Sequence, residues 1–60
     1  MMNYLFEIVM GEYEGVMFFV QENSQDAAFV AALEISEQSI VQYHGEYSDE
    51  EAEMMGYDTF

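Results

Sequence analysis

Residues 3–21 read NYLFEIVMGEYEGVMFFVQ, and this stretch decides the fold. The side chains of residues 3–10 alternate between two faces with the period of two that is typical of a β-strand. The segment GEYEG at residues 11–15 follows as a hairpin loop, in which either glycine can adopt the positive φ of a turn. A second strand is predicted over residues 16–21. Its apolar run does not alternate, so we expect both of its faces to be covered, as in a central strand.

A helix is predicted from Gln25 to about Glu37. Asn23 or Ser24 can cap its start, and Asp26 lies in the first turn, where the helix dipole favours an anion. Its apolar stripe, which we expect to lie on the two strands, consists of Phe29, Val30 and Leu33. Ala27, Ala28, Ala31 and Ala32 lie beside this stripe and allow the helix to approach the sheet closely.

A third strand is predicted over Ile40–Tyr47, and a short acidic helix is predicted to follow it. In regular alternation Val41, Tyr43 and Tyr47 share one face of the strand, and Ile40, Gln42, His44 and Glu46 share the other. The helix starts at a capping box formed by Ser48 and Glu51 and ends at Met55, with Gly56 as its cap. At about two turns it cannot hold alone, so it needs an anchor from Met54, Met55, Tyr57 or Phe60.

These elements predict an α+β fold in a single domain, residues 1–60. A three-stranded antiparallel sheet is packed by one helix in the order β-β-α-β, and the short acidic C-terminal helix follows. Either that last helix or a second subunit, in a homodimer, is expected to cover the remaining face of residues 16–20.

The charge balance excludes several classes of function. The 60 residues contain 13 Asp or Glu, no Lys or Arg and one His, for a formal charge of -13, and there is no Cys. Without cations the chain has no phosphate clamp and no electrostatic footprint for nucleic acid or anionic lipid, so we expect it to bind neither directly. No apolar run approaches the length of a membrane span, and residues 1–10 lack the basic start of a signal peptide. A soluble cytoplasmic protein is therefore expected.

Catalysis is not predicted, because His44 has no nucleophile motif beside it and a domain of this size is expected to have little room for a substrate cleft of about 300 Å³ or more. No cofactor is expected. The acidic residues from Glu46 to Asp58 lack the spacing of a calcium-binding loop, so no metal site is predicted either.

The acidic side chains themselves form the candidate site for a protein partner. Carboxylates two apart on a strand lie about 6.6 Å apart, and those three or four apart on a helix have Cβ atoms about 5–6 Å apart. Both spacings approximate a phosphate ladder, and tyrosine rings among them can stack on arginine side chains. The predicted partner-binding residues are Glu12, Tyr13, Glu14, Glu46, Tyr47, Asp49, Glu50, Glu51, Glu53 and Asp58.

In size, acidity and order of elements the whole chain resembles the small, acidic, phage-encoded inhibitors of bacterial defence, chiefly anti-CRISPR proteins and other DNA mimics. The resemblance uses no signature motif. It implies a protein of the host bacterial cytoplasm that occupies the basic channel in which a CRISPR complex or nuclease reads its DNA target. Two other interpretations of the acidity stay open: solubility alone, and contact with a basic partner of another kind. The alternative function is an antitoxin or small oligomeric interaction subunit that neutralises such a partner.

Overall fold

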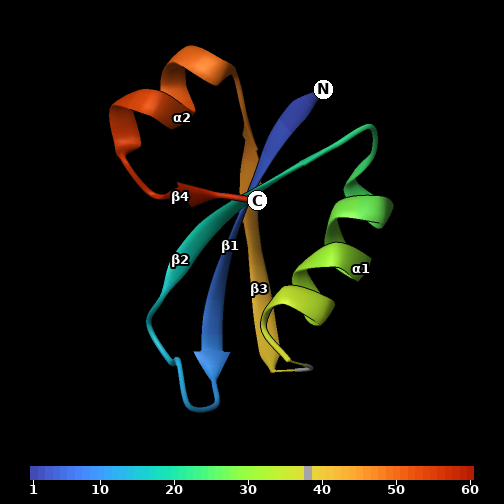
Figure 1. Ribbon diagram of the computed structural model, residues 1–60, viewed down its shortest axis with the longest axis vertical. Coiled ribbons are helices and arrows are strands. Elements are labelled where there is room, and N and C mark those ends of the chain that lie inside the picture. Colours follow the sequence, from blue (N-terminus) through green and yellow to red (C-terminus); the bar gives the residue numbers. More distant parts are fainter. Residues whose placement is uncertain (38) are drawn as a thin grey trace.

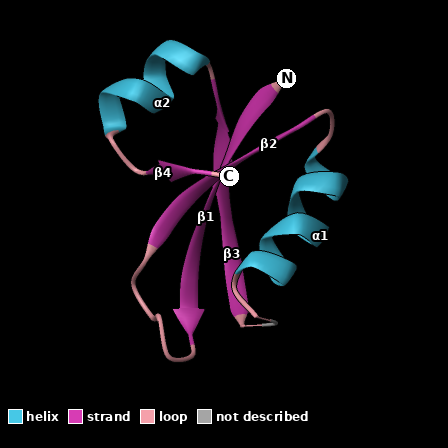
Figure 2. Cartoon of the chain, viewed as in Figure 1, coloured by secondary structure: helices cyan, strands magenta, loops and turns pink. Residues whose placement is uncertain are grey.

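The computed structural model of the chain describes residues 1–37 and 39–60, and its helices and strands are shown in Figures 1 and 2. In chain order the elements are β1 (Met2–Met10), β2 (Met17–Glu22), α1 (Gln25–Ile35), β3 (Ile40–Tyr47), α2 (Asp49–Met55) and β4 (Asp58–Thr59). The bounds of the three long strands agree with the prediction to within a residue, and α1 ends two residues earlier than predicted.

The strands form one sheet in the order β3-β1-β2-β4. β1 is antiparallel to both β2 and β3, which confirms the predicted three-stranded core. The prediction missed β4, which pairs in parallel with β2 through Asp58 and Thr59. The Phe60 N–H donates to the Phe19 carbonyl at 2.8 Å, next to this pairing. A strand of two residues is too short to show any side-chain period, so the sequence pattern could not predict it.

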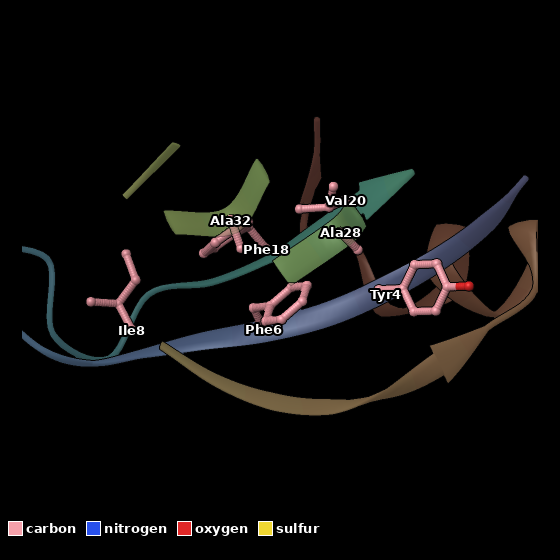
Figure 3. Close-up of a cluster of buried hydrophobic side chains, with 7 residues drawn as sticks. All are labelled: Tyr4, Phe6, Ile8, Phe18, Val20, Ala28 and Ala32. Atoms are coloured by element: carbon pink, nitrogen blue, oxygen red, sulfur yellow. The ribbon is translucent and has the colours of Figure 1, made fainter. Parts of the chain in front are cut away.

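The two helices lie on opposite sides of the sheet (Figure 1). On the α1 side the buried residues include Phe6, Phe18 and Val20, which gather beneath the helix (Figure 3). On the α2 side, Leu5 and Phe19 pack with Ala52 of the helix. The prediction that β2 needs cover on both faces is confirmed, and the second cover is α2 of the same chain.

The predicted close approach of α1 through alanines is confirmed at Ala28 and Ala32, but the predicted burial of its large residues is wrong. Ala28 and Ala32 are the fully buried residues of the helix, whereas Phe29 and Val30 are 42% and 57% exposed and Leu33 is half-buried. The reason is space, because the sheet already presents large rings on this face. Only methyl side chains let the helix approach a surface filled in this way, since protein interiors are close-packed.

A bulge in β3 changes which side chains share a face. Leu5 of β1 pairs with Gly45, but the next residue of β1, Phe6, pairs with Tyr43, so His44 is an extra residue in the strand. Gly45 has a φ of 154°, a conformation that side-chain-bearing residues rarely adopt. The alternation after residue 44 is therefore inverted. Tyr43 packs on the α1 side and Tyr47 on the α2 side, so the prediction that they share a face is wrong.

The capping box at the start of α2 is confirmed. The Glu51 N–H donates to the Ser48 hydroxyl at 3.2 Å, and the Ser48 N–H donates to the Glu51 carboxylate at 3.1 Å. Two of the four predicted anchors hold the segment, because the ring of Tyr57 neighbours Phe19 and that of Phe60 neighbours Phe18. All four side chains stay partly exposed, and Met54 is the most exposed of them at 82%.

Candidate functional site

None of the thirteen carboxylates is buried in the described chain. Eleven are exposed, while Glu7 and Glu22 are half-buried. One ion pair occurs among the described residues: the His44 Nε2 atom lies 2.8 Å from a Glu7 carboxylate oxygen, a pairing that carries charge when the histidine is protonated. The negative charge of the surface is thus almost uncompensated within the chain.

The predicted site residues do not form one continuous ladder. Glu12, Tyr13 and Glu14 lie in the β1–β2 loop at one end of the longest axis, and α2 lies towards the other end (Figure 1). The molecule is 29 Å long in that direction. The hairpin loop follows the end of β1, whereas α2 follows the end of β3, which pairs with the start of β1 through Asn3 and Tyr47. The length of β1 therefore separates the two acidic groups.

Four of the predicted residues are brought together by α2: Asp49, Glu50, Glu51 and Glu53. We call these four residues the α2 acidic cluster. All four are exposed, and they fall within five consecutive residues. At a rise of 1.5 Å per residue this corresponds to about 6 Å of helix axis. The cluster therefore carries one charge per about 1.5–2 Å, close to the value of about 1.7 Å for duplex DNA.

An open groove of about 500 Å³ lies beside this cluster, although a domain of this size was expected to have little room for a cleft of about 300 Å³ or more. Asp49 and Glu53, one helical turn apart, contribute carboxylates to it. Tyr57 also lines the groove and was predicted only as an anchor. Its position one residue after the cap of an acidic helix is the feature of the sequence that could have indicated a place in this site. The remaining lining residues are Asn3, Gln21, Ala52, Gly56 and Thr59.

A buried amide attaches the start of α2 to the sheet. Asn3 of β1 is 1% exposed, and its Nδ2 atom donates to the Asp49 carboxylate at 2.7 Å and to the Tyr47 carbonyl at 3.3 Å. A hydrogen bond to a charged group contributes more than one between neutral groups. Asp49 is therefore partly structural, whereas no hydrogen bond holds the Glu50 and Glu53 carboxylates among the described contacts.

Replacing Asn3 with alanine is expected to release α2 before the sheet unfolds. The loss of a buried hydrogen bond to a carboxylate lowers the free energy of unfolding by about 1.5–3 kcal/mol. Amide hydrogen exchange should show α2 losing protection while β1 and β2 keep most of theirs. The exposed Asn23→Ala variant is the matched control and should leave α2 protected; equal loss of protection in both variants would contradict the role assigned to Asn3.

The bulge separates Glu46 from His44, which regular alternation places on one face of β3. Glu46 pairs with Tyr4 of β1, whose side chain lies in the cluster on the α1 side of the sheet, so Glu46 lies on that side too. Burial raises the pKa of the Tyr4 hydroxyl above its ordinary value, and the Glu46 carboxylate raises it further. His44 pairs with Glu7, not with Glu46. The Tyr47 ring packs edge-on against Phe19, at 6.0 Å between centroids, and is half-buried. A partner contact by Glu46 or Tyr47 stays a prediction.

Two predicted residues that are far apart in sequence meet at a smaller pocket. Tyr13 of the hairpin loop and Asp58 of β4 both line a cavity of about 150 Å³ whose other walls are mostly apolar. This pocket is separate from the groove beside α2, with which it shares no lining residue.

Within residues 1–37 and 39–60, no three His, Asp or Glu side chains lie close enough together to hold a metal ion. Neither helix of the described chain is both long enough and apolar enough to cross a membrane. No protein-family model, no curated protein and no solved structure matches the chain.

Proposed function

We propose that this protein is an inhibitor that mimics nucleic acid, and that it binds the basic nucleic-acid channel of a CRISPR complex or another bacterial defence effector. The observation that supports the proposal most is the α2 acidic cluster, which presents exposed carboxylates at about the linear charge density of a DNA duplex. A channel lined by Lys and Arg normally binds the negative charge of its nucleic-acid substrate. In this proposal the carboxylates of the protein supply that charge instead.

Helix stability alone does not explain this cluster. Asp49, Glu50 and Glu51 lie in the first turn, where the helix dipole favours anions. Glu53 lies in the second half of the helix, where the same dipole favours cations, and α2 carries no basic residue there. An acid at this position fits a surface selected for negative charge.

The groove adds a means of recognising arginine. Tyr57 offers a flat ring, and Glu53 offers a carboxylate at the same groove. A guanidinium group can stack on the ring while it donates to the carboxylate, a combination that lysine reproduces poorly. In this proposal an arginine that normally contacts a phosphate or base enters the groove.

The ionic mechanism predicts a strong dependence of binding on salt. The Debye length falls from about 10 Å at 0.1 M to about 3 Å at 1 M salt, so the affinity for a basic effector should fall steeply across that range. Fluorescence anisotropy of the labelled protein with a purified CRISPR complex measures this affinity, and a DNA target is then added as a competitor. Binding that is unchanged by salt, or that leaves the DNA bound, would contradict the proposal.

A second candidate function follows from apolar exposure beside the acids. Met54 of α2 is 82% exposed and Phe60 is 57% exposed. An antitoxin or oligomeric interaction subunit would use such side chains as its main contacts, with acidity serving only to neutralise a basic partner. Its complex would survive about 1 M salt, where ionic attraction is screened, so the same titration separates the two functions.

A further inference from the structure

β3 forms one edge of the sheet, and within the described chain it has a partner strand, β1, on one side only. An unpaired strand edge presents backbone N–H and C=O groups that can pair with another chain. Proteins commonly guard such edges with lysine or proline, and this chain contains neither. The bulge at His44 and Gly45 disrupts one end of the strand, and a second register shift between Ile8 and Met10 of β1 disrupts the pairing at Ile40. Residues 41–43 are therefore the regular part of the edge.

The acidic residues avoid this region. Residues 39–45 contain no Asp or Glu, and neither do residues 27–33 of α1, although the chain has thirteen in 60 residues. The Glu7 carboxylate of the neighbouring β1 is half-buried and already pairs with His44, so a basic partner would find little free negative charge here. A second molecule of this chain, repelled by the acids elsewhere, meets the least repulsion along this edge.

Apolar side chains of α1 lie exposed on the α1 side of the sheet. The ring of Phe29 lies 6.3 Å from that of Phe6, and the Phe6 ring lies 5.7 Å from that of Tyr43 on β3. Phe29 therefore lies on the same side of the sheet as Tyr43. Phe29 and the adjacent Val30 are large residues that the sequence pattern predicts to be buried, and the single chain leaves both exposed.

We propose that a second copy of this chain pairs with β3 along its free edge, antiparallel and about a two-fold axis perpendicular to the sheet. This symmetry makes the contact self-complementary and joins the two sheets into one. It also places both copies of α1 on the same face, where Phe29 and Val30 can be covered. α2 lies on the opposite face, so both acidic clusters stay accessible.

The net charge gives this dimer an unusual response to salt. Each copy carries a formal charge of -13, so electrostatic repulsion opposes association, and screening should relieve it. Dimerisation is expected to strengthen as salt rises, whereas the proposed binding to a basic effector weakens. The failure of one proposal can thus be told from the failure of the other.

Sedimentation equilibrium at low and high salt tests the dimer. The expected result is a species of twice the 7.0 kDa chain mass at about 1 M salt, with partial dissociation at about 0.1 M. Gln42→Glu adds a carboxylate of the same shape to the exposed middle of the edge and should weaken the dimer by about tenfold. Because residue 42 lies opposite Glu7 of β1, urea titration at low salt measures separately any effect on the folding of the single chain. Gln25→Glu adds the same charge at the exposed start of α1 and should change it little.

Amide hydrogen exchange locates the contact. Amides in residues 41–43 that point away from β1 should gain protection as the protein concentration rises at high salt. A chain that stays at 7.0 kDa under all conditions would overturn the proposal. So would equal weakening by Gln42→Glu and Gln25→Glu, or an interface whose formation leaves the β3 amides unprotected.

Discussion

Replacing both Glu50 and Glu53 with lysine is expected to abolish inhibition, with affinity for the basic effector falling by about 100-fold or more. The substitution leaves α2 with two carboxylates and two ammonium groups, so the helix carries no net charge. Each lysine would also face the cations of the channel, and like charges in contact cost several kcal/mol. Affinity measured at fixed low salt against the same CRISPR complex gives the loss directly.

Glu50 and Glu53 were chosen so that the loss of affinity is not caused by unfolding. Glu50 and Glu53 are exposed, whereas Asp49 accepts from Asn3 and Glu51 belongs to the capping box. The double variant should therefore unfold at nearly the wild-type urea concentration. The control is Glu34→Lys with Glu37→Lys, which changes the total charge equally at two exposed positions near the end of α1. Similar losses in both double variants would mean that total charge, and not the cluster, drives binding.

Replacing Phe19 with alanine is expected to leave the chain largely unfolded. Phe19 is 0% exposed and is central to the α2 side of the core, where the rings of Tyr47 and Tyr57 neighbour it. Truncation of a buried phenylalanine lowers the free energy of unfolding by about 3–5 kcal/mol. A domain of this length is stable by roughly 3–9 kcal/mol in total. Far-UV circular dichroism and urea titration measure the outcome.

Phe29→Ala is the matched control, because it removes the same ring from a position that is 42% exposed. Its effect on unfolding should be about 1–1.5 kcal/mol, in proportion to the smaller apolar area that leaves water. Both variants are compared at low salt, where the proposed dimer is weakest. Equal destabilisation by the two would contradict the burial of Phe19 and the exposure of Phe29.

Local patterns predicted much of the fold. The alternation in residues 3–10, the glycine-bounded loop and the pairing of Ser48 with Glu51 each depend on residues that are close in sequence, and the structure confirms all three. The exposed acids of α2 were predicted for the same reason, since one helix carries them all. Such features persist in any tertiary arrangement because their hydrogen bonds and side-chain spacing are local.

Features that depend on distant residues were mispredicted or missed. Phe29 fits the helical period of a buried residue, but the rings of the sheet leave room only for Ala28 and Ala32. The bulge at Gly45 inverts the end of β3 and moves Glu46 away from His44. The local period of apolar residues does not show how large the side chains on the facing sheet are. It also does not show the register of a neighbouring strand.

By itself, then, the sequence determined the negative charge, the long strands, both helices and the cap of α2. Only the tertiary structure decided which face of α1 is buried, that residues 58–59 pair with β2, and that the hairpin acids lie far from those of α2. The physical reason is that the charge of a segment and the side-chain period of its strand or helix depend on that segment alone. Packing and strand register arise only when segments from distant parts of the chain compete for the same space.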